Sequence, residues 1–157
     1  AETTGIIVFL IGVSSIMAWI LAFTGIPAAI SNALLGISNN KIVILLIINV
    51  ILLVVGTFMD ITPAILIFTP IFLPVVTSDL IGMTAIQFGI MLVFNLCIGT
   101  ITPPVGNILF VGVRVAKTSI ERVIKPLLPY YGVIILVLLL VTFVPAISMF
   151  LPRLMGF

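Results

Sequence analysis

The sequence predicts an all-α integral membrane protein, and three observations support this prediction. Of the 157 residues, 63% are hydrophobic and 6% are charged, whereas a soluble domain carries roughly 25% charged residues. Uncharged apolar stretches recur at lengths that suit membrane helices. Two stretches are interrupted by glycine, threonine and proline, which predicts a re-entrant helical hairpin and a discontinuous helix among the membrane helices.

Residues 1–40 predict a spanning helix followed by a short helix in the membrane interface. Residues 4–23 form an uncharged, largely apolar stretch, about 20 residues long, which is the length of one membrane crossing. Residues 27–38 are shorter and mixed in polarity, and Pro27 suits the first turn of a helix. We therefore expect one spanning helix and one interfacial arm helix in this region.

Residues 41–78 predict the re-entrant hairpin. The apolar arms, 42–55 and 61–77, flank a polar tip near 56–62. The first arm is short for a full crossing, which takes about 20 residues. A hairpin that enters and leaves on one side of the membrane fits this pattern, while two short full spans remain possible.

Residues 84–116 predict the discontinuous helix, with helical segments 84–98 and 108–116 around an unwound stretch. Four of the six basic residues lie in the following loop, 114–126. The positive-inside rule places this loop in the cytoplasm and the C-terminus outside. The last segment, 127–157, holds the final span, with Tyr130 and Tyr131 suited to a membrane interface.

The hairpin tip and the break in the next helix share a pattern of Gly-Thr, then Thr-Pro, then an apolar arm. Proline leaves backbone carbonyls unpaired, and such carbonyls are tolerated in lipid only where protein buries them or they line a cavity. We therefore expect Thr102 and the tip at Gly56 and Thr57 to lie on opposite sides of one cation site. Hydroxyl, carbonyl and carboxylate oxygens suit a hard cation such as Na⁺. The cation-site candidates are Gly56, Thr57, Asp60, Thr62, Gly99, Thr100 and Thr102.

A second set of residues is expected to shape the site or face a substrate. This set consists of Pro63, Asn95, Pro103, Pro104, Gly106 and Asn107. Simpler interpretations remain open: prolines that only kink helices, Asn95 as a hydrogen-bonding contact between helices, and Asn107 as a helix cap. Asp60 is expected to be ionised and held within protein, because a carboxylate facing lipid is strongly unfavourable. The alternative interpretation is that Asp60 is a charged loop residue at the membrane interface.

The stretches GTFMDITPAILIFTPIFLPV and FNLCIGTITPPVGNILFV closely resemble the large membrane (M) subunit of tripartite ATP-independent periplasmic (TRAP) transporters. The resemblance covers essentially the whole chain and corresponds to the C-terminal half of that subunit. It implies one inverted-repeat half of an elevator-type transport domain, with 41–126 as the moving part. It also implies Na⁺ coupling and uptake of an organic anion of the C4-dicarboxylate or sialic-acid class. The matching positions are Gly56, Thr57, Asp60, Thr62, Pro63, Asn95, Gly99, Thr100, Thr102, Pro103, Pro104 and Gly106.

The resemblance also implies partners and a location. These are the N-terminal half of the same subunit, the small membrane (Q) subunit, a periplasmic substrate-binding protein, and the lipid of the bacterial inner membrane. The chain starts without Met, and we expect it to be part of a longer subunit.

Two other functions stay open: a divalent-anion/Na⁺ symporter that needs no binding protein, and a non-transporting assembly subunit. No nucleophile–base pair or phosphate loop indicates an enzyme, and no organic cofactor is expected. A formal charge of +2 gives no reason to expect nucleic-acid binding.

Overall fold

The computed structural model describes residues 9, 12–13, 16, 19–20, 23–38, 40–103 and 106–156. All regular structure in these residues is helical, so the all-α prediction is confirmed over this part of the chain. Most of the expected span 4–23, and Pro104, lie outside the described residues.

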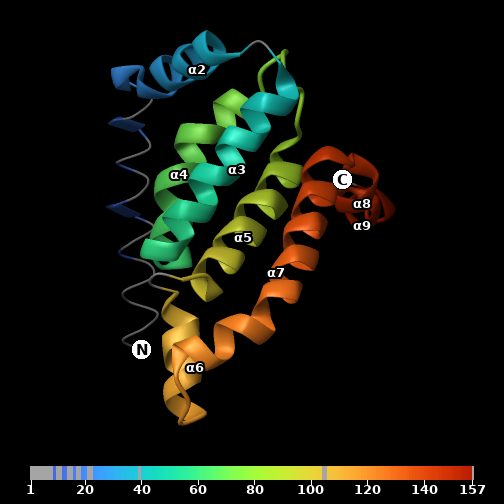
Figure 1. Ribbon diagram of the computed structural model, residues 1–157. Helices are drawn as coiled ribbons and strands as arrows, with labels where there is room; N and C mark the ends of the chain where they lie inside the picture. Colours follow the sequence, from blue (N-terminus) through green and yellow to red (C-terminus); the bar gives the residue numbers. More distant parts are fainter. Residues whose placement is uncertain are drawn as a thin grey trace.

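Four helices lie side by side and form the body of the molecule (Figure 1). They are α3 (Lys41–Phe58), α4 (Ile61–Val76), α5 (Ala85–Ile101) and α7 (Ile120–Phe143). The short helix α2 (Ile26–Ile37) lies across one end of this body, and α6 (Asn107–Val115) lies at the other end (Figure 1). Two short helices, α8 (Pro145–Ser148) and α9 (Phe150–Leu154), follow α7.

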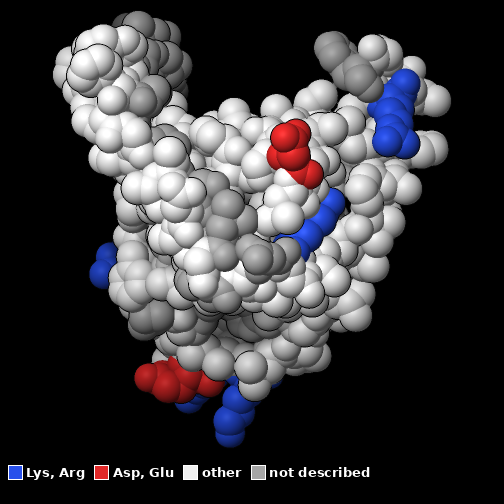
Figure 2. All heavy atoms as spheres, turned by 90° about the horizontal axis from the view of Figure 1, so that it is seen from above, with Lys and Arg blue, Asp and Glu red and all other residues white. Residues whose placement is uncertain are grey.

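Among the residues that the structure describes, α3 and α7 are long and apolar enough to cross a membrane by length and composition, whereas α4 and α5 are apolar but shorter. Figure 2 shows the molecule from above, where the charged side chains are few and most of the described surface is uncharged.

The helices α3 and α4 form a tight helical hairpin. Asn40 begins α3 by accepting a hydrogen bond from the Ile42 N–H at 2.9 Å, which satisfies one of the free amides of the first turn. Only Met59 and Asp60 separate the two helices. Pro63 lies in the first turn of α4, where its missing N–H costs nothing. The helix α3 extends to Phe58, so Gly56 and Thr57 are helical and the tip is narrower than the predicted 56–62.

The discontinuous helix is present as α5 and α6, but two of its predicted boundaries were wrong. The first half continues to Ile101 instead of ending at residue 98, so Gly99 and Thr100 are helical. Gly106, with φ 42°, is the cap of α6, and Asn107 is its first helical residue. The expectation that Asn107 caps this helix is therefore wrong, because the cap position takes a left-handed backbone that glycine adopts without strain.

The core lies between α3, α4 and α5. It consists of Ile44, Leu45, Ile48 and Leu52 of α3, Ala64, Phe72, Val75 and Val76 of α4, Phe88, Met91, Leu92 and Leu96 of α5, and Ile81 and Met83 of the connection. In a membrane the hydrophobic effect contributes little to the association of helices, because lipid tails are as apolar as the core side chains. Close packing and hydrogen bonds between helices must then hold such a core together.

Candidate functional site

The hairpin and the broken helix meet at two glycines. A Cβ placed on Gly99 of α5 would lie 2.4 Å from the carbonyl carbon of Gly56 in α3, and one placed on Gly56 would lie 3.1 Å from the Leu96 carbonyl oxygen. Only glycine at both positions lets the two backbones approach this closely. This contact fixes the end of the hairpin arm against the last turns of α5.

Gly106 joins the break to the hairpin directly. Its backbone N–H donates to the Thr57 carbonyl at 3.3 Å. Gly106 is buried, and a Cβ on it would lie 2.8 Å from the Thr102 carbonyl oxygen. The tip and the break therefore lie together, as the sequence predicts, and that they share a cation remains a prediction.

The three threonines near this junction use their hydroxyl protons within their own helices. Thr57 donates to the Val54 carbonyl at 2.7 Å, Thr100 to the Cys97 carbonyl at 2.8 Å, and Thr102 to the Ile98 carbonyl at 2.6 Å. These bonds satisfy the hydroxyl protons locally, as threonines in membrane helices often do. They also leave hydroxyl lone pairs, which can accept a hydrogen bond or bind a cation.

A cavity of about 430 Å³ adjoins the junction. Thr57 from the hairpin and Thr102 from the break both line it, so residues 45 positions apart in sequence face one space. Its other lining residues are Leu53, Val54, Phe58, Ile98, Pro103, Tyr131 and Ile135. The surface of the cavity is mostly apolar, and the lining side chains that carry an oxygen are those of Thr57, Thr102 and Tyr131.

Tyr131 is a residue of this cavity that the sequence analysis missed. It was assigned to the membrane interface with Tyr130, yet its side chain is half-buried and its hydroxyl donates to the Ile101 carbonyl at the end of α5. Tyr130 is 65% exposed and fits the interfacial assignment better. The partner of Tyr131 lies 30 residues away, so no local pattern could have distinguished the two tyrosines.

The remaining tip residues lie outside the cavity. Asp60 precedes the first turn of α4 at the hairpin tip, and its side chain is exposed in this chain, contrary to the expectation that protein encloses it. Thr62 is also exposed, and Pro63 is half-buried. Neither Asp60 nor Thr62 lines the cavity beside Thr57 and Thr102. The structure thus brings Thr57 and Thr102 of the predicted cation site together, and it leaves the carboxylate of Asp60 at the surface.

Asn95 lies in a separate buried cluster between α3, α5 and α7. Its Nδ2 donates to the Asn49 Oδ1 at 2.7 Å and to the Met91 carbonyl at 2.8 Å. The Thr142 hydroxyl of α7 donates to the Leu138 carbonyl at 2.8 Å and lies 3.4 Å from the same Asn49 oxygen. Gln87 donates to the Thr142 carbonyl at 3.1 Å. All four polar side chains are buried. The structure therefore favours the alternative in which Asn95 is a hydrogen-bonding contact between helices.

The amide orientations in this cluster follow from one another. The Nδ2 of Asn49 donates to the Leu45 carbonyl at 2.7 Å, which turns its oxygen toward Asn95. Asn95 must then present its N–H, and its own Oδ1 is buried without a hydrogen-bond partner among the described residues. Asn49 stands alone as a polar residue in the apolar run 42–55. This isolated asparagine is the sequence signal for the buried cluster.

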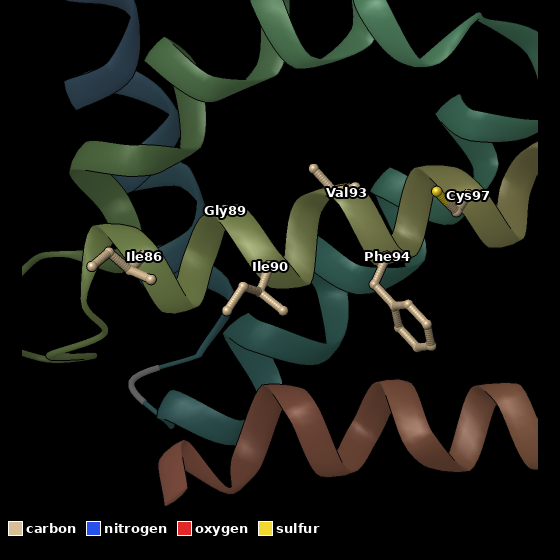
Figure 3. A pocket seen from close by; sticks show the side chains of 6 residues that line it. All are labelled: Ile86, Gly89, Ile90, Val93, Phe94 and Cys97. Carbon is tan, nitrogen blue, oxygen red and sulfur yellow. The ribbon is translucent and has the colours of Figure 1, made fainter. Parts of the chain in front are cut away.

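A larger hollow of about 500 Å³ lies along one face of α5, and none of its lining side chains carries an oxygen. Figure 3 shows its lining as a row of side chains along this one helix. They are Ile86, Gly89, Ile90, Val93, Phe94 and Cys97. Because this lining is apolar apart from the cysteine sulfur, the hollow offers no oxygen set for a cation or donors for an anion.

Comparison with known proteins places the chain among membrane transporters. Residues 1–147 match the family model described as "Tripartite ATP-independent periplasmic transporter, DctM component". The chain is 51% identical over 152 residues to the protein YgiK of Salmonella typhimurium. It is 45% identical over 150 residues to the isethionate TRAP transporter permease protein DctMQ of Oleidesulfovibrio alaskensis. It is 40% identical over 154 residues to the C4-dicarboxylate TRAP transporter large permease protein DctM of Vibrio cholerae.

These matches include nearly all of the chain but a minor part of each relative. They cover 97%, 96% and 98% of the chain, and 34%, 23% and 34% of the Salmonella, Oleidesulfovibrio and Vibrio proteins. The chain thus spans about a third or less of the length of these curated relatives.

Proposed function

This chain belongs to the DctM component family of tripartite ATP-independent periplasmic transporters, and we propose that it supplies half of a Na⁺-coupled transport domain that imports an organic anion. Membership of a transporter family confirms the expectation that the chain is not an enzyme. In this proposal a periplasmic binding protein delivers the anion, and the transport domain carries it across the membrane by an elevator motion.

The observation that supports the proposal most strongly is the junction between the hairpin and the break. The Gly106 N–H to Thr57 carbonyl bond and the Gly56–Gly99 contact hold two interrupted segments together, and Thr57 and Thr102 face one cavity. Interrupted helices that meet within a membrane protein supply carbonyl oxygens for cations and amides for anions. We propose that Na⁺ binds at this junction, with the oxygens of Thr57 and Thr102 as its nearest side-chain donors.

The substrate proposal rests on the named relatives and on the start of α6. Two relatives are named for isethionate and for C4-dicarboxylate, both small organic anions. The first amides of α6 begin at the break, and helix N-termini favour negative charge. We propose an anion of the C4-dicarboxylate or sialic-acid class, bound beside the cation so that each offsets the charge of the other.

The proposed surroundings follow from the family. The chain would work with the N-terminal part of the same large subunit, a small membrane subunit and a periplasmic binding protein, in the bacterial inner membrane. The hairpin α3–α4 would be re-entrant, opening at the periplasmic side. The loop 114–125 would lie in the cytoplasm, because it carries four basic residues, and the C-terminus would lie in the periplasm.

The test is uptake by the complete transporter in proteoliposomes. A panel of radiolabelled C4-dicarboxylates, isethionate and sialic acid is offered with and without the cognate binding protein, under a Na⁺ gradient or a K⁺ gradient of equal size. We expect uptake of one anion that needs both Na⁺ and the binding protein. Uptake without the binding protein would indicate the symporter alternative. Equal uptake in Na⁺ and K⁺ would exclude Na⁺ coupling, and no uptake of any anion by a folded complex would support an assembly role.

The part of Asp60 in this function is tested by Asp60→Asn, with Asp79→Asn as the matched control. Both aspartates are exposed, but Asp60 adjoins the hairpin tip and Asp79 lies in the connection after α4. If Asp60 supports the cation site electrostatically, its variant needs more Na⁺ for half-maximal uptake at a similar maximal rate. Loss of all Na⁺ response would indicate direct binding, and an unchanged Na⁺ dependence would return Asp60 to the class of loop charges.

A further inference from the structure

Tyr131 and Tyr130 are adjacent in α7 but differ in what they contact. The Tyr131 hydroxyl donates to the Ile101 carbonyl, and its side chain lines the cavity with Thr57 and Thr102. Tyr130 is 65% exposed and does not line this cavity. The first half of α7 contains Pro126 and Pro129 and changes direction there (Figure 1), as expected for prolines inside a helix.

The carbonyl that Tyr131 contacts is the last one of α5. Carbonyls in the final turn of a helix have no N–H partner from the next turn, and in a membrane they need another donor. The residue that follows is Thr102, whose N–H returns to the Gly99 carbonyl at 2.9 Å and whose side chain faces the cavity. The Tyr131 hydroxyl therefore fixes the peptide plane between Ile101 and Thr102 at the point where the helix breaks.

We propose that Tyr131 is a positioning residue for the coupling cation. Its hydroxyl holds the end of α5 in the orientation that lets the oxygens of Thr57 and Thr102 face the same space. The aromatic ring covers one side of that space, and the hydroxyl bond connects α7 to the break. This inference rests on the proposed Na⁺ site at the junction and adds to it a residue from a third helix.

The experiment compares Tyr131→Phe with Tyr130→Phe in the complete transporter. Each change removes one hydroxyl and keeps the ring, so the pair separates the hydrogen bond from ring packing. The first readout is the Na⁺ concentration for half-maximal uptake, measured separately from the maximal rate. The second readout is hydrogen exchange of peptides containing Thr102 and Gly106 without Na⁺. The Thr102 N–H is bonded to the Gly99 carbonyl at the end of α5, and the Gly106 N–H is bonded to the Thr57 carbonyl of the hairpin.

Loss of one neutral hydrogen bond should raise the half-maximal Na⁺ concentration of Tyr131→Phe about threefold to tenfold, with a nearly unchanged maximal rate. Exchange at the break should be faster in the same variant, and Tyr130→Phe should match the wild type in both readouts. An unchanged Na⁺ requirement with a lower maximal rate would overturn the proposal, as would identical behaviour of the two variants. Wild-type uptake that is equal in Na⁺ and K⁺ would instead overturn the Na⁺ site itself, and the positioning role with it.

Discussion

Gly56 and Gly99 place the backbones of α3 and α5 in direct contact, so that a Cβ on Gly99 would lie 2.4 Å from the Gly56 carbonyl carbon. The atoms on both sides of this contact belong to the helix backbones. A methyl group there cannot be accommodated by rotation of a side chain, and the helices themselves must separate. In lipid, where close packing holds helices together, such separation weakens the whole α3–α5 interface.

We predict that Gly99→Ala destabilises the protein by about 1–3 kcal/mol, the usual cost of overpacking. Gly89→Ala is the matched control, because Gly89 lies in the same helix and a Cβ there has nothing within 4 Å. Alanine at position 89 should be neutral or stabilising by up to about 1 kcal/mol, since glycine weakens helix interiors. Thermal unfolding of both variants in one detergent measures the difference. Equal melting temperatures would show that the glycine contact does not limit packing.

We predict that Gly106→Ala impairs uptake more than it lowers stability. An alanine would require a left-handed backbone with φ 42° and would place its Cβ 2.8 Å from the Thr102 carbonyl oxygen, so the break must change shape. The Gly106 to Thr57 bond would then lengthen or be lost. Gly112→Ala in the same helix α6, where a Cβ has nothing within 4 Å, should retain wild-type uptake. Equal uptake by the two variants would contradict the role assigned to Gly106.

Asn49 and Asn95 should be energetically coupled. Replacing either by leucine removes a hydrogen bond of 2.7 Å between α3 and α5 and should cost about 1–2 kcal/mol. After either single change the remaining asparagine keeps a buried amide group that has lost its hydrogen-bond partner on the other helix. The double variant removes both amide groups. The double variant should therefore be less destabilised than the sum of the single changes, by about 0.5–3 kcal/mol. Additive losses in melting experiments would show that the two amides act independently.

Lys117 occupies a position where glycine is expected. The N–H of Thr118 donates to the Val113 carbonyl at 3.0 Å, and the N–H of Lys117 to the Arg114 carbonyl at 3.2 Å. These two bonds form a Schellman motif at the end of α6, with Lys117 at φ 50°. Lys117→Gly should stabilise the protein by about 0.5–1 kcal/mol. Lys117→Ala, which removes the charge but keeps the strained backbone, should give no such gain. A gain of the same size for both would assign the effect to charge.

The helical segments that the structure describes could be predicted because hydropathy and breaks in the chain are local signals. The apolar arms on both sides of Met59 and Asp60 predicted the hairpin, and Thr102 to Gly106 marked the break. The helix ends were placed less well. Gly99 and Thr100 indicated an early end of α5, but Gly99 is needed for packing against Gly56, and Thr100 bonds back within its own helix.

The contacts that complete the site could not be predicted from local patterns. Tyr131 reaches a carbonyl 30 residues away, and Thr142 reaches Asn49 over 93 residues. Nothing in the sequence near either residue distinguishes it from an ordinary residue of a spanning helix. The exposure of Asp60 has a related cause, since a residue at a hairpin tip takes its surroundings from distant segments. The break in the backbone has a local signal in the sequence, whereas these long-range side-chain contacts have none.

The buried amide of Asn49 has a consequence for how the protein is made. When α3 leaves the ribosome, its polar oxygen has neither of its later partners, because Asn95 follows 46 residues later and Thr142 follows 93 residues later. A translating ribosome must therefore add α4 and most of α5 before the first of these bonds can form. During that interval α3 carries an unsatisfied amide oxygen that lipid does not accommodate. Release of α3 into the bilayer before α5 has emerged would leave this oxygen without either of these partners.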